Sequence, residues 1–254
     1  MKKENLVLLQ PFPSNSILLS GFIDYLSDYY NVYFIDLPGF IKGVPPLEKI
    51  TFKGFCDYVD SKIKELNLDG YLAEGISFGF AIMNHLNHDE RCRGIIALEP
   101  FIGSRSLHYG PIKKWLLTSV IETVCSLKIY SLFWGSPLLA KYLPKLMHYP
   151  SNTVRVLFDQ IDGRTFFETA KIILKDDRVY RFQDLPYVLI ANKHDRMVDF
   201  DYIYATLSQN VTRLLVLNIE IDHYPSDTSK AYFQKIVPEE MIQKITAFFG
   251  ESSV

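Results

Sequence analysis

The chain has 254 residues, of which 48% are hydrophobic and 22% are charged, close to the values of ordinary globular proteins. This composition excludes a disordered or collagen-like chain, and the length allows one large domain or two small ones. The formal net charge of −2 gives no long-range attraction to nucleic acid or to a membrane, so we expect neither partner. Three widely spaced cysteines, Cys56, Cys92 and Cys125, argue against disulfides or a zinc site and favour buried thiols in a reducing compartment.

Two apolar stretches resemble a targeting signal or a membrane span only at first sight. The run Leu6–Leu9 is too short for the hydrophobic part of a signal peptide and is followed by two prolines. The stretch 115–140 is interrupted by Glu122 and Lys128 before it reaches membrane-spanning length. We therefore expect an unprocessed, soluble and cytoplasmic protein.

Short apolar runs alternate with helical patterns through the first hundred residues. Four runs are too apolar to be half-exposed, which predicts buried strands at Asn5–Gln10, Val32–Asp36, Tyr71–Glu74 and Gly94–Leu98. Apolar residues recur every three or four positions between them, which predicts helices at Ile17–Leu26, Phe55–Leu66 and Phe78–Leu86. Strands that alternate with helices predict a mostly parallel sheet with helices on both faces, an α/β fold.

The alternation stops in the segment 103–184, where only helix-like patterns occur. Turn residues divide this segment into about four short helices. Strands resume at Tyr187–Ala191 and Leu214–Ile219, and a last helix is predicted at Pro238–Phe249. Because the helical segment is much longer than an ordinary loop, we predict one α/β core, residues 1–102 and 185–254, with a helical cap inserted at residues 103–184.

The sequence Gly75-Ile76-Ser77-Phe78-Gly79 has the form Gly-x-Ser-x-Gly. The pattern alone occurs by chance in many chains, so its position matters more. It follows a predicted strand and opens a predicted helix, the setting in which a serine is held in a strained turn with its hydroxyl exposed. The alternative is a serine that only caps a helix. We predict that Ser77 is a nucleophile.

A serine hydroxyl needs a base to remove its proton and an acid to orient that base. His223 follows the last predicted parallel strand and therefore lies at the same sheet edge as Ser77. Asp195 follows the preceding strand, which gives the order serine, acid, histidine. His194 is the rival base, but it faces elsewhere if Asp195 is the acid. Glu99, just past another strand, is the alternative acid.

These residues together resemble the α/β-hydrolase superfamily, in particular its esterase-like branch with a helical cap. The segments that carry the resemblance are Leu6–Pro13, Asp36–Phe40, Gly75–Gly79, Asp195–Val198 and His223. The resemblance implies the α/β-hydrolase fold with its N-terminal antiparallel hairpin missing, a triad of Ser77, Asp195 and His223, and neither cofactor nor metal. It also implies an oxyanion hole formed by the backbone amides of Phe12 and Phe78.

The sequence departs from the family pattern at two places near this site. Gln10-Pro11-Phe12-Pro13 stands where the family commonly has His-Gly-x-Pro, and Pro11 has no amide hydrogen to donate. Glu74 interrupts an otherwise apolar strand. A charge there needs a partner, and without one the pKa of Glu74 should rise.

The predicted function is a serine hydrolase that cleaves a small, partly apolar carboxylic ester through an acyl-enzyme intermediate. The aromatic and aliphatic residues of segment 103–184 predict an apolar substrate site, and its lysines are expected on a solvated outer face: Lys113, Lys114, Lys128, Lys141 and Lys145. A carbon–carbon bond hydrolase, a lactonase or an acyltransferase with the same triad stays open, as does a non-catalytic, receptor-like protein that binds a small molecule. The sequence does not indicate the oligomeric state.

Overall fold

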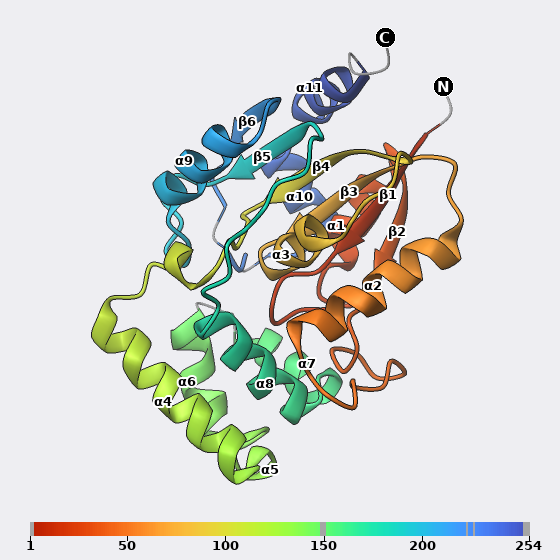
Figure 1. The fold of residues 1–254 in the computed structure, drawn as a ribbon. Helices are drawn as coiled ribbons and strands as arrows, with labels where there is room; N and C mark the ends of the chain where they lie inside the picture. The colour runs from red at the N-terminus through yellow and green to blue at the C-terminus, as the bar shows by residue number, and fades with distance from the viewer. Residues whose placement is uncertain (1–2, 148–150, 222, 226, 251–254) are drawn as a thin grey trace.

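The computed structural model describes residues 3–147, 151–221, 223–225 and 227–250 (Figure 1). Its centre is a six-stranded sheet in the order β2-β1-β3-β4-β5-β6, and all neighbouring strands are parallel. The strands are β1 (Glu4–Leu9), β2 (Tyr30–Ile35), β3 (Tyr71–Ile76), β4 (Cys92–Leu98), β5 (Tyr187–Ala191) and β6 (Leu214–Asn218). The predicted parallel sheet is therefore confirmed.

Alternate residues of the strands pack into two separate cores, one on each face of the sheet. In β1, Val7 and Leu9 belong to one core, whereas Leu6 and Leu8 belong to the other. Helices α2 (Phe52–Leu66), α3 (Phe78–His85) and α9 (Phe200–Asn210) cover the first face. Helices α1 (Ser20–Leu26), α10 (Lys230–Ile236) and α11 (Glu239–Gly250) cover the second. Burial on both faces explains why these strands read as continuous apolar runs.

Two helices start three residues away from the predicted position, and a third helix was not predicted. Helix α2 begins three residues early because the Thr51 side chain accepts a hydrogen bond from the Gly54 amide and caps the first turn. Helix α1 begins only at Ser20, since residues 16–19 form turns. The sequence analysis missed α10, a seven-residue helix capped by Ser229, which is too short to show a helical period.

In the described residues, the segment between β4 and β5 contains five α-helices, where the sequence predicted about four. They are α4 (Pro111–Leu127), α5 (Tyr130–Phe133), α6 (Pro137–Met147), α7 (Ser151–Gln160) and α8 (Gly163–Leu174), preceded by the short 3₁₀ helix η1 (Ser104–Ser106). The first is 17 residues long and not short as predicted. Figure 1 shows these helices gathered below the sheet, beyond the carboxyl ends of the strands. None of the described helices is long and apolar enough to cross a membrane.

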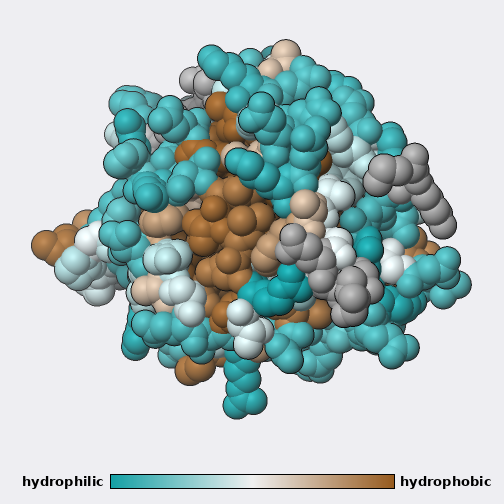
Figure 2. Space-filling model, turned by 90° about the horizontal axis from the view of Figure 1, so that it is seen from above, coloured by the Kyte–Doolittle hydropathy of each residue, from teal (hydrophilic) through white to brown (hydrophobic). Residues whose placement is uncertain are grey.

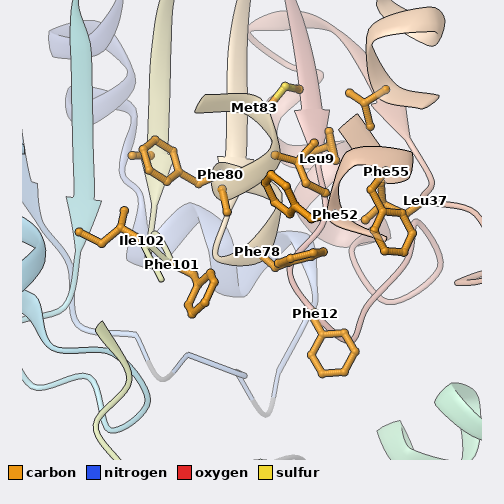
Figure 3. Close-up of a cluster of buried hydrophobic side chains, with 14 of the residues drawn as sticks. Leu9, Phe12, Leu37, Phe52, Phe55, Phe78, Phe80, Met83, Phe101 and Ile102 are labelled. Atoms are coloured by element: carbon orange, nitrogen blue, oxygen red, sulfur yellow. The ribbon is translucent and has the colours of Figure 1, made fainter. Parts of the chain in front are cut away.

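Aromatic side chains connect the sheet to this helical segment. Figure 3 shows Phe78 and Phe101 near the strand ends, and Phe12 still farther beyond them. The ring of Phe12 packs against Phe166 of α8 with a centroid distance of 5.2 Å. The main chain adds an antiparallel bridge between Leu107 and Val198. The helical segment is therefore fixed to the edge of the sheet at which the β-strands end.

Candidate active site

Ser77 occupies the tight turn between β3 and α3, with backbone angles φ 49° and ψ −114°. A residue with a Cβ atom rarely adopts this conformation, so neighbouring groups must hold it there. The Ser77 amide donates a hydrogen bond to the Leu98 carbonyl at 3.0 Å, and the Phe101 amide donates to the Ser77 carbonyl at 3.2 Å. These bonds to the end of β4 fix the turn that presents the serine hydroxyl.

The two glycines that flank Ser77 are required by the close approach of neighbouring backbone. A Cβ atom on Gly75 would lie 2.4 Å from the Cα atom of Phe80, and one on Gly79 would lie 2.5 Å from the carbonyl oxygen of Gln10. Real Cβ contacts are essentially never below 3.0 Å. Only glycine lets α3 start this close to β3 and to the loop after β1.

His223 links Ser77 to Asp195 through both of its ring nitrogens. Nε2 lies 3.0 Å from the Ser77 hydroxyl oxygen, and Nδ1 lies 2.8 Å from Oδ2 of Asp195. The carboxylate accepts the proton of Nδ1, which leaves Nε2 free to accept the hydroxyl proton of Ser77. Residues that are 146 positions apart in the chain therefore form one hydrogen-bonded relay.

Asp195 is buried and is surrounded by hydrogen-bond donors. Its Oδ1 atom accepts from the amides of Met197 and Val198, at 2.5 and 3.0 Å. Burial acts to raise the pKa of Asp195, but the hydrogen bonds from His223 and from these two amides outweigh it and hold the pKa below its ordinary value. Asp195 is thus an anion near neutral pH and can stabilise a protonated His223.

Glu99, the alternative acid, is close to the relay but makes no hydrogen bond to His223 among the described contacts. Its Oε1 atom accepts from the Asn192 amide at 2.7 Å, while the buried Oε2 atom has no hydrogen-bond partner in the described part of the chain. Burial, and then the nearby charge of Asp195, raise the pKa of Glu99 to about 10. Glu99 is therefore neutral at pH 7.

His194, the rival base, points away from this relay. It is exposed, and its main-chain amide donates to the side chain of Asn192 at 2.9 Å. Ligand atoms of Glu99, Asp195 and His223 lie within 4.8 Å of one another, close enough to hold an ion. Both ring nitrogens of His223 are engaged by Asp195 and Ser77, however, so an ion could bind only by breaking the relay.

The loop after β1 is braced by the side chains of Gln10 and Tyr224, neither of which was predicted to have this role. The fully buried Gln10 donates to the Ser14 carbonyl at 2.5 Å and accepts from the Leu37 amide at 3.2 Å. The hydroxyl of Tyr224, next to His223, donates to the Phe12 carbonyl. No local pattern could reveal the latter contact, because it joins residues 212 positions apart. Pro11 is thus part of a loop whose shape is set by side-chain hydrogen bonds.

The predicted oxyanion donors border the same cavity as Ser77 and His223. Phe12 and Phe78 both line it, and within the described residues neither of their amides donates to a protein acceptor. The two amides are therefore available to a ligand oxygen, which is what an oxyanion hole requires.

The cavity has a volume of about 180 Å³ and lies between the sheet edge and helices α4, α6 and α8. Its walls are almost entirely apolar. Among the described residues that line it, the polar side chains are Ser77, His223, Tyr109 and Tyr224, and none is aspartate, glutamate, lysine or arginine. A bound molecule would meet one polar spot, at Ser77 and His223, in an otherwise apolar site.

The lysines of the helical segment lie outside this cavity. Lys113, Lys128, Lys141 and Lys145 are exposed, as the sequence predicts. Lys114 is the exception, because it is half-buried and donates to the Ser104 carbonyl and hydroxyl at 3.2 and 2.8 Å.

No family model and no curated protein matches the sequence. Solved structures do align with it over nearly the whole chain. An esterase from Exiguobacterium antarcticum is 12% identical, with a TM-score of 0.67, and the alignment covers 98% of this chain and 92% of that one. A thermophilic esterase from Thermogutta terrifontis is 14% identical (TM-score 0.65, coverage 100% and 92%), and an enol-lactonase from Burkholderia xenovorans is also 14% identical (TM-score 0.64, coverage 98% and 92%).

Sheet order, the strained serine turn and these alignments together show that the chain has the α/β-hydrolase fold. The resemblance to that superfamily, first seen in the sequence, is confirmed at the level of the fold.

Proposed function

We propose that the chain is a serine hydrolase that cleaves a small, partly apolar carboxylic ester. The observation that carries the proposal is the unbroken relay from Ser77 through His223 to Asp195, with its serine end in an apolar cavity. The serine-hydrolase mechanism uses these three roles, a nucleophile, a base and an acid that orients the base.

The reaction follows from the positions of the donors and acceptors. Ser77 Oγ attacks the ester carbonyl while His223 Nε2 takes its proton, and the amides of Phe12 and Phe78 stabilise the oxyanion. His223 then gives that proton to the departing alcohol, which leaves an acyl-enzyme. Water attacks the acyl group with His223 again as base, and the proton returns to Ser77 as the acid product leaves. Asp195 stabilises the imidazolium in both halves.

The cavity supports a small, uncharged acyl group as the substrate class. Its volume of about 180 Å³ is below the roughly 300 Å³ at which sites for drug-sized ligands begin. Burying an ionised group against these apolar walls, with no charged partner, would cost several kcal/mol. We take segment 103–184 as the cap that forms these walls over a core of residues 1–102 and 185–254.

A fluorophosphonate probe tests the nucleophile, and a series of p-nitrophenyl esters tests the substrate class. The probe should label Ser77 in the wild type and leave Ser77→Ala unlabelled, although that variant stays folded. Hydrolysis should increase from acetate as methylenes are added, each contributing up to about 0.8 kcal/mol, and should fall once the cavity is full. Absence of labelling would overturn the mechanism. Labelling without turnover on any ester would favour the receptor-like alternative, and a preference for succinyl over butyryl esters would contradict the apolar site.

A further inference from the structure

Helix α4 carries apolar side chains both toward the cavity and toward the outside, and the two apolar faces meet at Val120. Leu117, Ile121 and Val124 point inward and line the cavity. On the outer side, five large apolar side chains are between 51% and 74% exposed: Ile112, Trp115, Leu116, Val120 and Leu127. We call these five residues the α4 face. Large apolar side chains that are exposed together on one face commonly mark an interaction site, so the α4 face indicates that something covers it.

The α4 face bears no charge along its length. Ser119, Thr123 and Ser126 share it by helical spacing, and they are uncharged as well. The 17 residues of α4 give the face a length of about 25 Å. The acid of the helix, Glu122, lies at the flank and is paired with Lys175 at 2.5 Å. An ordinary solvent-facing helix would carry charged residues at these positions.

Exposed lysines surround this apolar strip. Between positions 111 and 145 the chain has five lysines and one acidic residue, a net charge of +4, so the rest of the chain carries −6. Lys113 lies next to the α4 face by helical spacing, Lys128 directly follows the C-terminal end of α4, and Lys141 and Lys145 lie on α6; all four are exposed. Helix α4 lies in the lower part of Figure 1, so the view from above in Figure 2 shows the other side of the molecule, which is mostly hydrophilic around an apolar patch near its centre.

Neighbouring helices extend the same combination of residues. Leu132 of α5 and Leu138 and Tyr142 of α6 are 71%, 57% and 52% exposed. Large apolar side chains that include a tryptophan and a tyrosine, together with lysines and few acids, are typical of helices that lie in the headgroup layer of a membrane.

We propose that the α4 face adsorbs to the surface of an anionic lipid bilayer. Its apolar side chains would enter the headgroup region, and the flanking lysines would lie at the lipid phosphates. A second copy of the chain fits less well, because a two-fold interface across this face would bring the lysines of one copy against those of the other. The net charge of −2 does not oppose adsorption, since it averages a basic helical segment with an acidic remainder.

Adsorption would also place lipid next to the cavity. Val120 belongs to the α4 face and lines the cavity as well. That an acyl compound could pass from the lipid surface to Ser77 rests on the proposed function. Adsorption itself does not, because vesicle binding is measured without turnover.

The test is co-sedimentation of the full chain with vesicles of phosphatidylglycerol and phosphatidylcholine in equal parts, and with vesicles of phosphatidylcholine alone. The first should bind at least tenfold more protein, and 0.5 M salt should weaken that binding. Trp115→Asp combined with Leu116→Asp should lower binding at least tenfold. Val179→Asp is the control, because Val179 is 88% exposed but lies in the non-helical stretch between α8 and β5, away from helices α4, α5 and α6 in the chain. None of these three residues lines the cavity, so hydrolysis of a soluble short-chain ester should be unchanged.

A second set of variants makes the charge contribution separable. Lys113→Gln, Lys128→Gln and Lys141→Gln together should weaken binding to the anionic vesicles and reduce its dependence on salt. Equal binding to both vesicle types, no binding to either, or unchanged binding by the aspartate variant would overturn the proposal. A dimer that the aspartate variant dissociates, without vesicle binding by the wild type, would overturn it in favour of a protein interface.

Discussion

Replacing Glu99 by glutamine separates the two acids that lie beside His223. Asp195 accepts a hydrogen bond from His223 Nδ1 at 2.8 Å. Glu99 lies close by, and its pKa is raised to about 10. Because Glu99 is neutral at pH 7, glutamine reproduces its charge and can still accept from the Asn192 amide. We expect Glu99→Gln to keep kcat/KM within about threefold of the wild type. Asp195→Asn should lower the rate about 10⁴-fold, since the neutral amide favours the wrong tautomer of the imidazole.

The two effects differ by several kcal/mol in transition-state stabilisation. A loss of 10⁴ corresponds to about 5.5 kcal/mol, whereas threefold is about 0.7 kcal/mol. A pKa of about 10 means that only about one Glu99 side chain in a thousand is ionised at pH 7. Removing the charge of such a side chain should therefore change almost nothing in the field at His223.

The assay is kcat/KM for a short-chain p-nitrophenyl ester between pH 5 and pH 9. The pH profile should have the same midpoint on its acid side in the wild type and in Glu99→Gln. If Glu99 were ionised, glutamine would remove a negative charge that favours the imidazolium, and the midpoint would move to lower pH. Such a shift, or a loss of activity as large as that of Asp195→Asn, would refute the assignment of Asp195 as the acid.

Two further variants test the buried strand and the serine turn. Burial raises the pKa of Glu74 to about 8, as the sequence predicts. Between about pH 4.5 and pH 8 the folded state therefore keeps a proton that the unfolded state has released. As a result, the free energy of unfolding falls as the pH rises through this range. Glu74→Gln should therefore raise the Tm more at pH 8 than at pH 5, because it increases the free energy of unfolding by up to about 4 kcal/mol more at the higher pH. Equal gains at both pH values would contradict this reasoning. Gly79→Ala should push the loop after β1 away from Ser77 and lower kcat by about 10²-fold through the displaced Phe12 amide. Gly70→Ala, whose Cβ would meet only one atom, at 3.8 Å, is the control, and similar activity in both variants would show that the loop tolerates the shift.

The parts of the molecule that could be predicted from sequence are those with strong local patterns. Buried parallel strands need apolar residues on both faces, so β1, β3 and β5 could be located to within a few residues. Parallel strands also end at one edge, which is why residues following three of them, Ser77, Asp195 and His223, could be expected to meet. The glycines at 75 and 79 follow from the same close packing of strand, turn and helix.

Other features depend on contacts that no local pattern contains. Periodicity shows that α4 is an apolar helix, but it does not show which of two apolar faces packs inward. Four of the five lysines were correctly expected on the outside, Lys114 being the exception, but the exposed apolar side chains of the α4 face were not expected. The shape of the loop after β1 also depends on distant partners. Gln10 binds Leu37, 27 positions away, and Tyr224 binds Phe12, 212 positions away. Such partners become visible only when the chain is folded.

The contrast between Asp195 and Glu99 shows why position alone could not decide which acid serves His223. Both carboxyl groups are buried and both follow a strand. Asp195 accepts from two backbone amides and from the imidazole, whereas Glu99 accepts from one amide and has a bare second oxygen in the described structure. Hydrogen bonds to the charged form are what keep a buried carboxylate ionised. The tight turn that supplies the Met197 and Val198 amides therefore makes Asp195, and not Glu99, the anion beside the histidine.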